Sequence, residues 1–221
     1  HLPLPASLGG QTAFGEWILQ HQTVPTEDPF VALNQGIRLV DTNWLGQVLF
    51  AAAGLQLGPA GYSGLFSLSV LLAGLLLIRT FYLQSQSHWL SMAGLILVWT
   101  LCWSRPLVAH PATLGFVCLS CLLWIVSPIL NSMSTYSDSK NASEYQLPWR
   151  MLVAVPCLFA IWGNIHASVV AGWIVLLCIA LGRLIDVVWQ SRSVTEVLRD
   201  DSLRNLLVLM ELAFAASLLN P

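Results

Sequence analysis

Charged side chains are scarce in this sequence: Asp, Glu, Lys and Arg together make up only 9% of its 221 residues. The formal net charge is -2 and no basic cluster is present, which argues against a nucleic-acid partner. Apolar residues are abundant instead, at 56% of the chain, with ten Trp and a mean hydropathy of +0.71. Such a composition is typical of a protein that crosses a membrane several times. We therefore expect a lipid bilayer to be its main partner.

Cysteine is also sparse, and all five cysteines fall inside apolar runs. Cysteines in such runs usually behave as small hydrophobic residues, so the CxxC pair Cys118 and Cys121 is interpreted as packing. The sequence contains no ligand spacing typical of a structural metal. It therefore predicts neither a metal site nor a cofactor.

Long intervals without charge predict the membrane-spanning helices. We expect an all-α fold, a polytopic bundle of about six transmembrane helices. Polar loops are expected at 131–145 and 183–204. The predicted spans are 62–78, 88–103, 113–130, two helices within 151–182 that a break at 163–166 separates, and 205–219.

The region before the first span has a different pattern. Apolar residues recur at helical spacing within 1–23, which predicts a short amphipathic helix. Prolines and a glycine then place Glu27 and Asp28 on a loop. Asp41 and the two residues after it are good caps for a helix from Trp44 to about Leu57, which Gly58 and Pro59 end. We divide the chain into a loop region with interfacial helices, 1–61, and a transmembrane bundle, 62–221.

The basic residues predict the orientation. With the 1–61 region outside, seven of the nine Lys and Arg residues fall on or near the inner side. This agrees with the positive-inside rule, so residues 1–61 are expected to be extracytoplasmic. The predicted inner residues are Arg79, Lys140, Arg150, Arg183, Arg192, Arg199 and Arg204, against Arg38 and Arg105 outside.

The same topology gathers polar residues from distant parts of the sequence at the outer face. Each of them could be an ordinary surface residue, but a cation that binds phosphate beside a carboxylate that handles protons would form a site. Glu211 differs, because it lies within the last span, where a carboxyl group is either functional or packed toward the bundle. The gathered residues are Glu27, Asp28, Asp41, Arg105, His110, Asn164, His166 and Asn220.

Several short motifs, in order along the chain, resemble bacterial membrane proteins related to the GT-C glycosyltransferases. That superfamily includes enzymes similar to protein O-mannosyltransferase and to the lipid A aminoarabinose transferase. The motifs are GEWILQHQTVPTEDPF (15–30), DTNWLGQVLF (41–50), WSRP (103–106), WGNIHASVVAGW (162–173) and LLNP (218–221).

The resemblance implies a multi-pass protein of the bacterial plasma (inner) membrane. Such enzymes transfer a sugar from a polyprenyl-phosphate donor to an acceptor on the outer side. We expect no metal and no cofactor, because the lipid-linked sugar is itself the donor substrate. An acid of the first loop acts as general base, which points to Asp28, with Glu27 beside it. Residues that hold the lipid phosphate or the substrate would be Arg105, His110, Asn164 and His166.

The chain departs from the family pattern at several positions. Relatives carry an acid early in the first loop, where this chain has Ser7, and a glycine where it has Ala167. The family's preceding helix and later spans are not in this sequence, so we expect either the middle of a larger enzyme or a shortened relative. The alternative function is therefore a non-catalytic membrane subunit or transporter-like protein. In that case Asp28 is a turn residue and Glu27 a solvated one.

Overall fold

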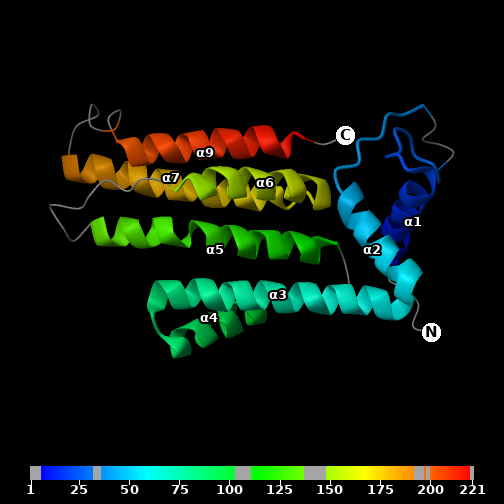
Figure 1. The fold of residues 1–221 in the computed structure, drawn as a ribbon, viewed down its shortest axis with the longest axis horizontal. Helices are drawn as coiled ribbons and strands as arrows, with labels where there is room; N and C mark the ends of the chain where they lie inside the picture. The colour runs from blue at the N-terminus through cyan, green and yellow to red at the C-terminus, as the bar shows by residue number, and fades with distance from the viewer. Residues whose placement is uncertain are drawn as a thin grey trace.

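A computed structural model describes residues 6–31, 36–102, 111–136, 148–191, 197 and 200–219. Regular structure within these ranges consists of eight labelled helices and contains no strand (Figure 1). One isolated bridge pairs the backbones of Glu27 and Arg38. The predicted all-α class is confirmed.

Six helices lie side by side as an elongated bundle in which successive helices run in opposite directions (Figure 1). The core between α5, α6, α7 and α9 contains fully buried aromatic and aliphatic side chains, among them Phe159, Trp162 and Leu209. α3 packs against α4 and α5, while α9 packs against α6 and α7. The bundle helices are α3 (Pro59–Ser85), α4 (His88–Leu101), α5 (Ala112–Tyr136), α6 (Trp149–Ile165), α7 (Val169–Ser191) and α9 (Asp201–Ser217).

Three of these helices are long and apolar enough to cross a membrane: α3, α5 up to Asn131 and α7 up to Trp189. The outward faces of α3 and α7 carry exposed leucine or isoleucine side chains, as expected for contact with lipid. α4, α6 and α9 have 14, 17 and 17 residues, which is short for a full crossing. Membrane association is thus supported, whereas the predicted number of about six spans is not confirmed.

Two predicted loops are shorter than expected. α5 continues through Asn131 to Tyr136, into the run predicted as a polar loop. α7 continues to Ser191 and contains Arg183, which we had placed in the loop 183–204. The helix tolerates Arg183 in a buried position because Asp200 neutralises its charge with two hydrogen bonds. Charge alone was therefore a poor marker of the helix end.

The other helix limits agree better with the sequence. The break in 151–182 is confirmed, although α6 runs on through Asn164 to Ile165 before the turn to α7. α2 has the predicted limits, Trp44–Leu57. Gly58 follows it at φ +61°, a left-handed conformation that glycine adopts without strain, and Pro59 begins α3.

An N-terminal layer, made of α1 (Ala6–His21), residues 22–31 and 36–43, and α2, crosses one end of the bundle (Figure 1). α1 and α2 pack directly on each other. A Cβ atom added at Gly15 would lie 2.3 Å from the backbone oxygen of Gln47, so glycine sets this close approach. We call the opposite end of the bundle, where α3 and α7 end and α6 and α9 begin, the far end.

Candidate functional site

The first turn of α2 is fixed to the turn between α6 and α7. The indole Nε1 of Trp44 donates to Oδ1 of Asn164 over 2.7 Å, and the backbone N–H of Ala167 donates to Oδ1 of Asn43 over 3.2 Å. A Cβ at Gly46 would stand 2.7 Å from the backbone oxygen of Ile165, so the two segments are in close backbone contact. We call these six residues the α2–α6 joint.

Asn164 is the central residue of this joint. Its side chain is buried, and its Nδ2 donates to the backbone oxygens of Ala160 at 2.7 Å and Leu219 at 2.9 Å. Together with the bond from Trp44, these contacts link three segments of the chain through one amide. Both N–H donors of the amide are used, so in this arrangement Asn164 positions the turn between α6 and α7 rather than presenting a donor to a ligand.

His166 lies directly after α6 and is half-buried. Its Nδ1 is 3.0 Å from the backbone nitrogen of Ser168 and accepts that N–H. A neutral imidazole with Nδ1 as acceptor carries its proton on Nε2. His166 is therefore arranged as a hydrogen-bond donor through Nε2, which suits contact with an anionic oxygen.

Asp28 and Glu27 lie in the irregular part of the N-terminal layer. Oδ1 of Asp28 accepts the backbone N–H groups of Phe30 at 2.9 Å and Val31 at 3.1 Å, forming a turn around the carboxylate. Oε2 of Glu27 accepts from the N–H of Gly36 at 3.3 Å. Asp28 is half-buried and Glu27 is exposed. The predicted turn role of Asp28 is thus seen.

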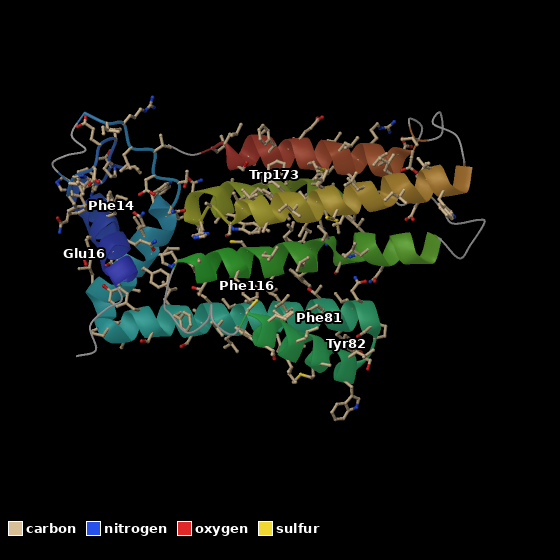
Figure 2. All side chains as sticks on the ribbon, turned by 180° about the vertical axis from the view of Figure 1, so that it is seen from behind. Phe14, Glu16, Phe81, Tyr82, Phe116 and Trp173 are labelled. Atoms are coloured by element: carbon tan, nitrogen blue, oxygen red, sulfur yellow. The ribbon has the colours of Figure 1, made fainter. Side chains whose placement is uncertain are left out.

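An aromatic contact holds this loop against α1. The rings of Phe14 and Phe30 meet edge to face with centroids 5.1 Å apart. Figure 2 shows Phe14 and Glu16 on α1 within the N-terminal layer, well away from Phe81 and Tyr82 in the far half of α3. The acidic loop therefore lies at the same end of the molecule as the α2–α6 joint.

Asp41 does not act as the predicted helix cap. Asn43 occupies the N-cap position of α2, without a side-chain capping bond. Oδ1 of Asp41 instead accepts the backbone N–H of Asn43 at 2.9 Å and the Nε2 of Gln47 at 3.3 Å. Because the carboxylate precedes the helix by several residues, it closes a turn before α2 and holds a side chain of the helix.

Two residues of this region, Trp44 and Gln47, have roles that sequence reasoning did not assign. Gln47 is buried, and its Oε1 has no hydrogen-bond partner in the part of the chain that the structure describes. The sequence signal is an amide and an indole in the first turn of a helix that is largely apolar.

Not every predicted site residue can be placed. Arg105, His110 and Asn220, and the side chain of Ser7, lie outside the described residues. Of the others, Asn164 and His166 come together beside the start of α2, and Glu27 and Asp28 share the loop of the N-terminal layer. Among the described ranges, no three His, Cys, Asp or Glu side chains are grouped so as to hold a metal ion.

No family model, curated protein or solved structure matches this chain.

Proposed function

We propose that the protein is a GT-C-like membrane glycosyltransferase that uses a polyprenyl-phosphate-linked sugar as donor. The observation that carries the proposal is the placement of a carboxylate loop over one end of an apolar helix bundle, on a layer fixed to the bundle beside His166. The ordered motifs of the sequence support the same assignment. A lipid-linked donor would keep its chain among the bundle helices and its phosphate at this end.

In the proposed reaction, an acceptor hydroxyl attacks the anomeric carbon of the sugar while the bond from that carbon to the phosphate oxygen breaks. Asp28 takes the hydroxyl proton, and the lipid phosphate leaves with the bonding electron pair. The configuration at the anomeric carbon inverts. His166, donating through Nε2, stabilises the developing phosphate charge together with Arg105 and His110.

The distribution of charge and tryptophan supports the proposed membrane placement, with the N-terminal layer outside a bacterial plasma membrane. Arg150 and Arg204 lie at the far end, at or near the starts of α6 and α9. Three tryptophans at that end are highly exposed: Trp89 at 87%, Trp149 at 70% and Trp189 at 83%. Exposed tryptophans near the ends of membrane helices are typical of the lipid headgroup region. We also propose that the bundle crosses the membrane about six times.

The turn around Asp28 gives a direct test of the catalytic role. Asp28→Asn keeps an Oδ1 that accepts the bonds from Phe30 and Val31, but it removes the base. We expect this variant to retain its thermal midpoint and membrane insertion while losing sugar transfer by at least about a hundredfold, the usual contribution of a general base. The measurement is transfer from a radiolabelled polyprenyl-phosphate sugar in proteoliposomes of the full-length protein.

Two matched variants complete the experiment. Glu27→Gln, at the neighbouring exposed carboxylate, should leave transfer within a fewfold of the parent. Asp28→Ala removes base and turn together, so it should lose both transfer and some stability. If Asp28→Asn transfers at the parental rate while Asp28→Ala does not, Asp28 serves the turn alone and the assignment fails.

A second candidate is a non-catalytic membrane subunit. The specific observation in its favour is that the amide N–H groups of Asn164 and the Nδ1 of His166 are used for hydrogen bonds inside the bundle and its α6–α7 turn. The same proteoliposome assay separates the candidates. A subunit would show no transfer with any polyprenyl-phosphate sugar, and Asp28→Asn would have no effect on its assembly.

A further inference from the structure

Glu211 presents a carboxyl group on the outward face of α9. The sequence predicts Glu211 within the last span, either functional or facing the bundle. In the structure its side chain is exposed instead. Its neighbours on that face are exposed and apolar, namely Leu207 at 47%, Val208 at 42% and Leu212 at 42%. No hydrogen bond or ion pair joins Glu211 to another residue that the structure describes.

Arg79 is likewise a charged residue on an exposed, apolar face, that of α3. It is exposed and continues a stripe of leucines at helical spacing, among them Leu72 at 43% and Leu75 at 54% exposure. It too makes no ion pair or hydrogen bond within the described ranges. The sequence had placed Arg79 at the end of a span, but α3 runs on to Ser85.

The two stripes face away from the bundle at opposite edges. α9 packs on α6 and α7 at one edge, and α3 packs on α5 and α4 toward the other (Figure 1). One molecule therefore cannot bring Arg79 and Glu211 together. A neighbouring copy in the same membrane, with the same orientation, can set its α3 against α9 of the first.

The depths of the two groups match closely enough for contact. Arg79 lies about 9 Å along the helix axis before Ser85, and Glu211 about 15 Å after Asp201, at ~1.5 Å per residue. Both helix ends belong to the far end of the bundle (Figure 1). Both groups thus lie within about three helical turns of the far end, and the long arginine side chain extends along a helix surface toward a partner.

We propose that the protein associates with a second copy of itself through these stripes, with Arg79 of one copy paired to Glu211 of the next. A charged side chain facing hydrocarbon is unfavourable, and intramembrane charges are normally paired with one another. The two stripes are apolar apart from these two opposite charges, so the α3 stripe of one copy complements the α9 stripe of another. This complementarity favours a second copy of the protein as the partner. The pairing also explains why a carboxyl group persists on a lipid-facing surface.

The contact is heterologous, because a different surface of each copy takes part. Each copy keeps one unpaired stripe after the first contact, so association continues until a ring closes or a row forms. The proposal depends on membrane placement but not on sugar transfer, and Asp28→Asn should leave it unchanged.

The test uses charge reversal in full-length protein reconstituted in lipid nanodiscs or membranes. Val208→Cys on one copy and Leu75→Cys on a differently tagged copy, both free of native cysteines, report the contact by disulfide cross-linking. Glu211→Arg on the first copy should reduce the cross-linked fraction about tenfold or more. Adding Arg79→Glu to the second copy should restore it, since the charges are then exchanged.

Controls separate loss of contact from loss of fold. Arg150→Glu, an exposed reversal on α6, should leave the cross-linked fraction unchanged, and every variant must keep the parental thermal midpoint. Restoration by the exchanged pair cannot come from misfolded protein. Folded single variants that cross-link as the parent does, or an exchanged pair that stays unlinked, would overturn the proposal in favour of a different membrane partner for Glu211.

Discussion

The indole N–H of Trp44 and the amide oxygen of Asn164 lie 2.7 Å apart although 120 positions separate the residues in sequence. This bond joins the first turn of α2 to the end of α6, and the same amide reaches the backbone of Leu219 after α9. One buried asparagine thus connects the N-terminal layer with two helices of the bundle.

Replacing either Trp44 or Asn164 should destabilise the protein, and the loss should be larger for Asn164. Trp44→Phe keeps an aromatic side chain but loses the N–H and part of the indole, so we expect the free energy of unfolding to fall by about 1–2 kcal/mol. Asn164→Leu leaves the buried indole N–H without its acceptor and the Leu219 carbonyl without the amide donor, and we expect a loss of about 2–3 kcal/mol. Reversible denaturation in mixed micelles measures both. In the double variant the effects should be less than additive, and full additivity would show that the bond contributes nothing.

The contact between α1 and α2 predicts opposite effects for two glycines of the same helix. A Cβ at Gly15 would lie 2.3 Å from the backbone oxygen of Gln47, whereas a Cβ at Gly10 meets nothing within 4 Å. We expect Gly15→Ala to destabilise the protein by about 1–3 kcal/mol, because backbone must move. Gly10→Ala should be neutral or stabilising by up to about 1 kcal/mol, because alanine favours a helix. Equal thermal midpoints for the two variants would contradict the close approach.

Two ion pairs between described residues of the far end should differ greatly in strength. The guanidinium of Arg183 donates to Asp200 through Nη2 at 2.6 Å and Nε at 3.2 Å, and both side chains are largely buried. Asp200 also accepts the backbone N–H of Leu203, so it caps α9. Arg183→Ala leaves this carboxylate buried and unpaired, for which we expect a loss of about 3–5 kcal/mol.

The control is the pair of Arg204 with Asp201, whose side chains are exposed at 66% and 42%. Arg204→Ala should change the free energy of unfolding by less than about 1 kcal/mol, because water screens the pair. Chemical denaturation of both variants under the same conditions gives the comparison. Similar losses for the two would mean that burial of Arg183 does not govern the strength of its pair.

The proposed orientation predicts which cysteine replacements an impermeant thiol reagent reaches in whole cells. Thr26 in the N-terminal layer and Arg150 at the far end are both exposed. In a background without native cysteines, Thr26→Cys should react in intact cells and Arg150→Cys only after the membrane is opened. The reverse pattern would place the N-terminal layer on the cytoplasmic side and would remove the basis for transfer outside the cell.

The sequence by itself determined the helical class and most helix positions, because long uncharged runs and breakers such as Gly58 and Pro59 act locally. α2 has the predicted limits for that reason. It also determined that Asp28 lies in a turn before a proline, since this depends on adjacent residues alone.

Only the tertiary structure decided what the polar residues contact. Arg183 entered a helix rather than a loop because Asp200, beyond the end of that helix, neutralises it. Asn164 became the joint between layer and bundle because Trp44 and Leu219 come to it from distant parts of the chain. Glu211 faces outward because packing of α9 on α6 and α7 fixes its rotation. Such pairings depend on which surfaces meet in space, and a one-dimensional pattern of charge does not encode that.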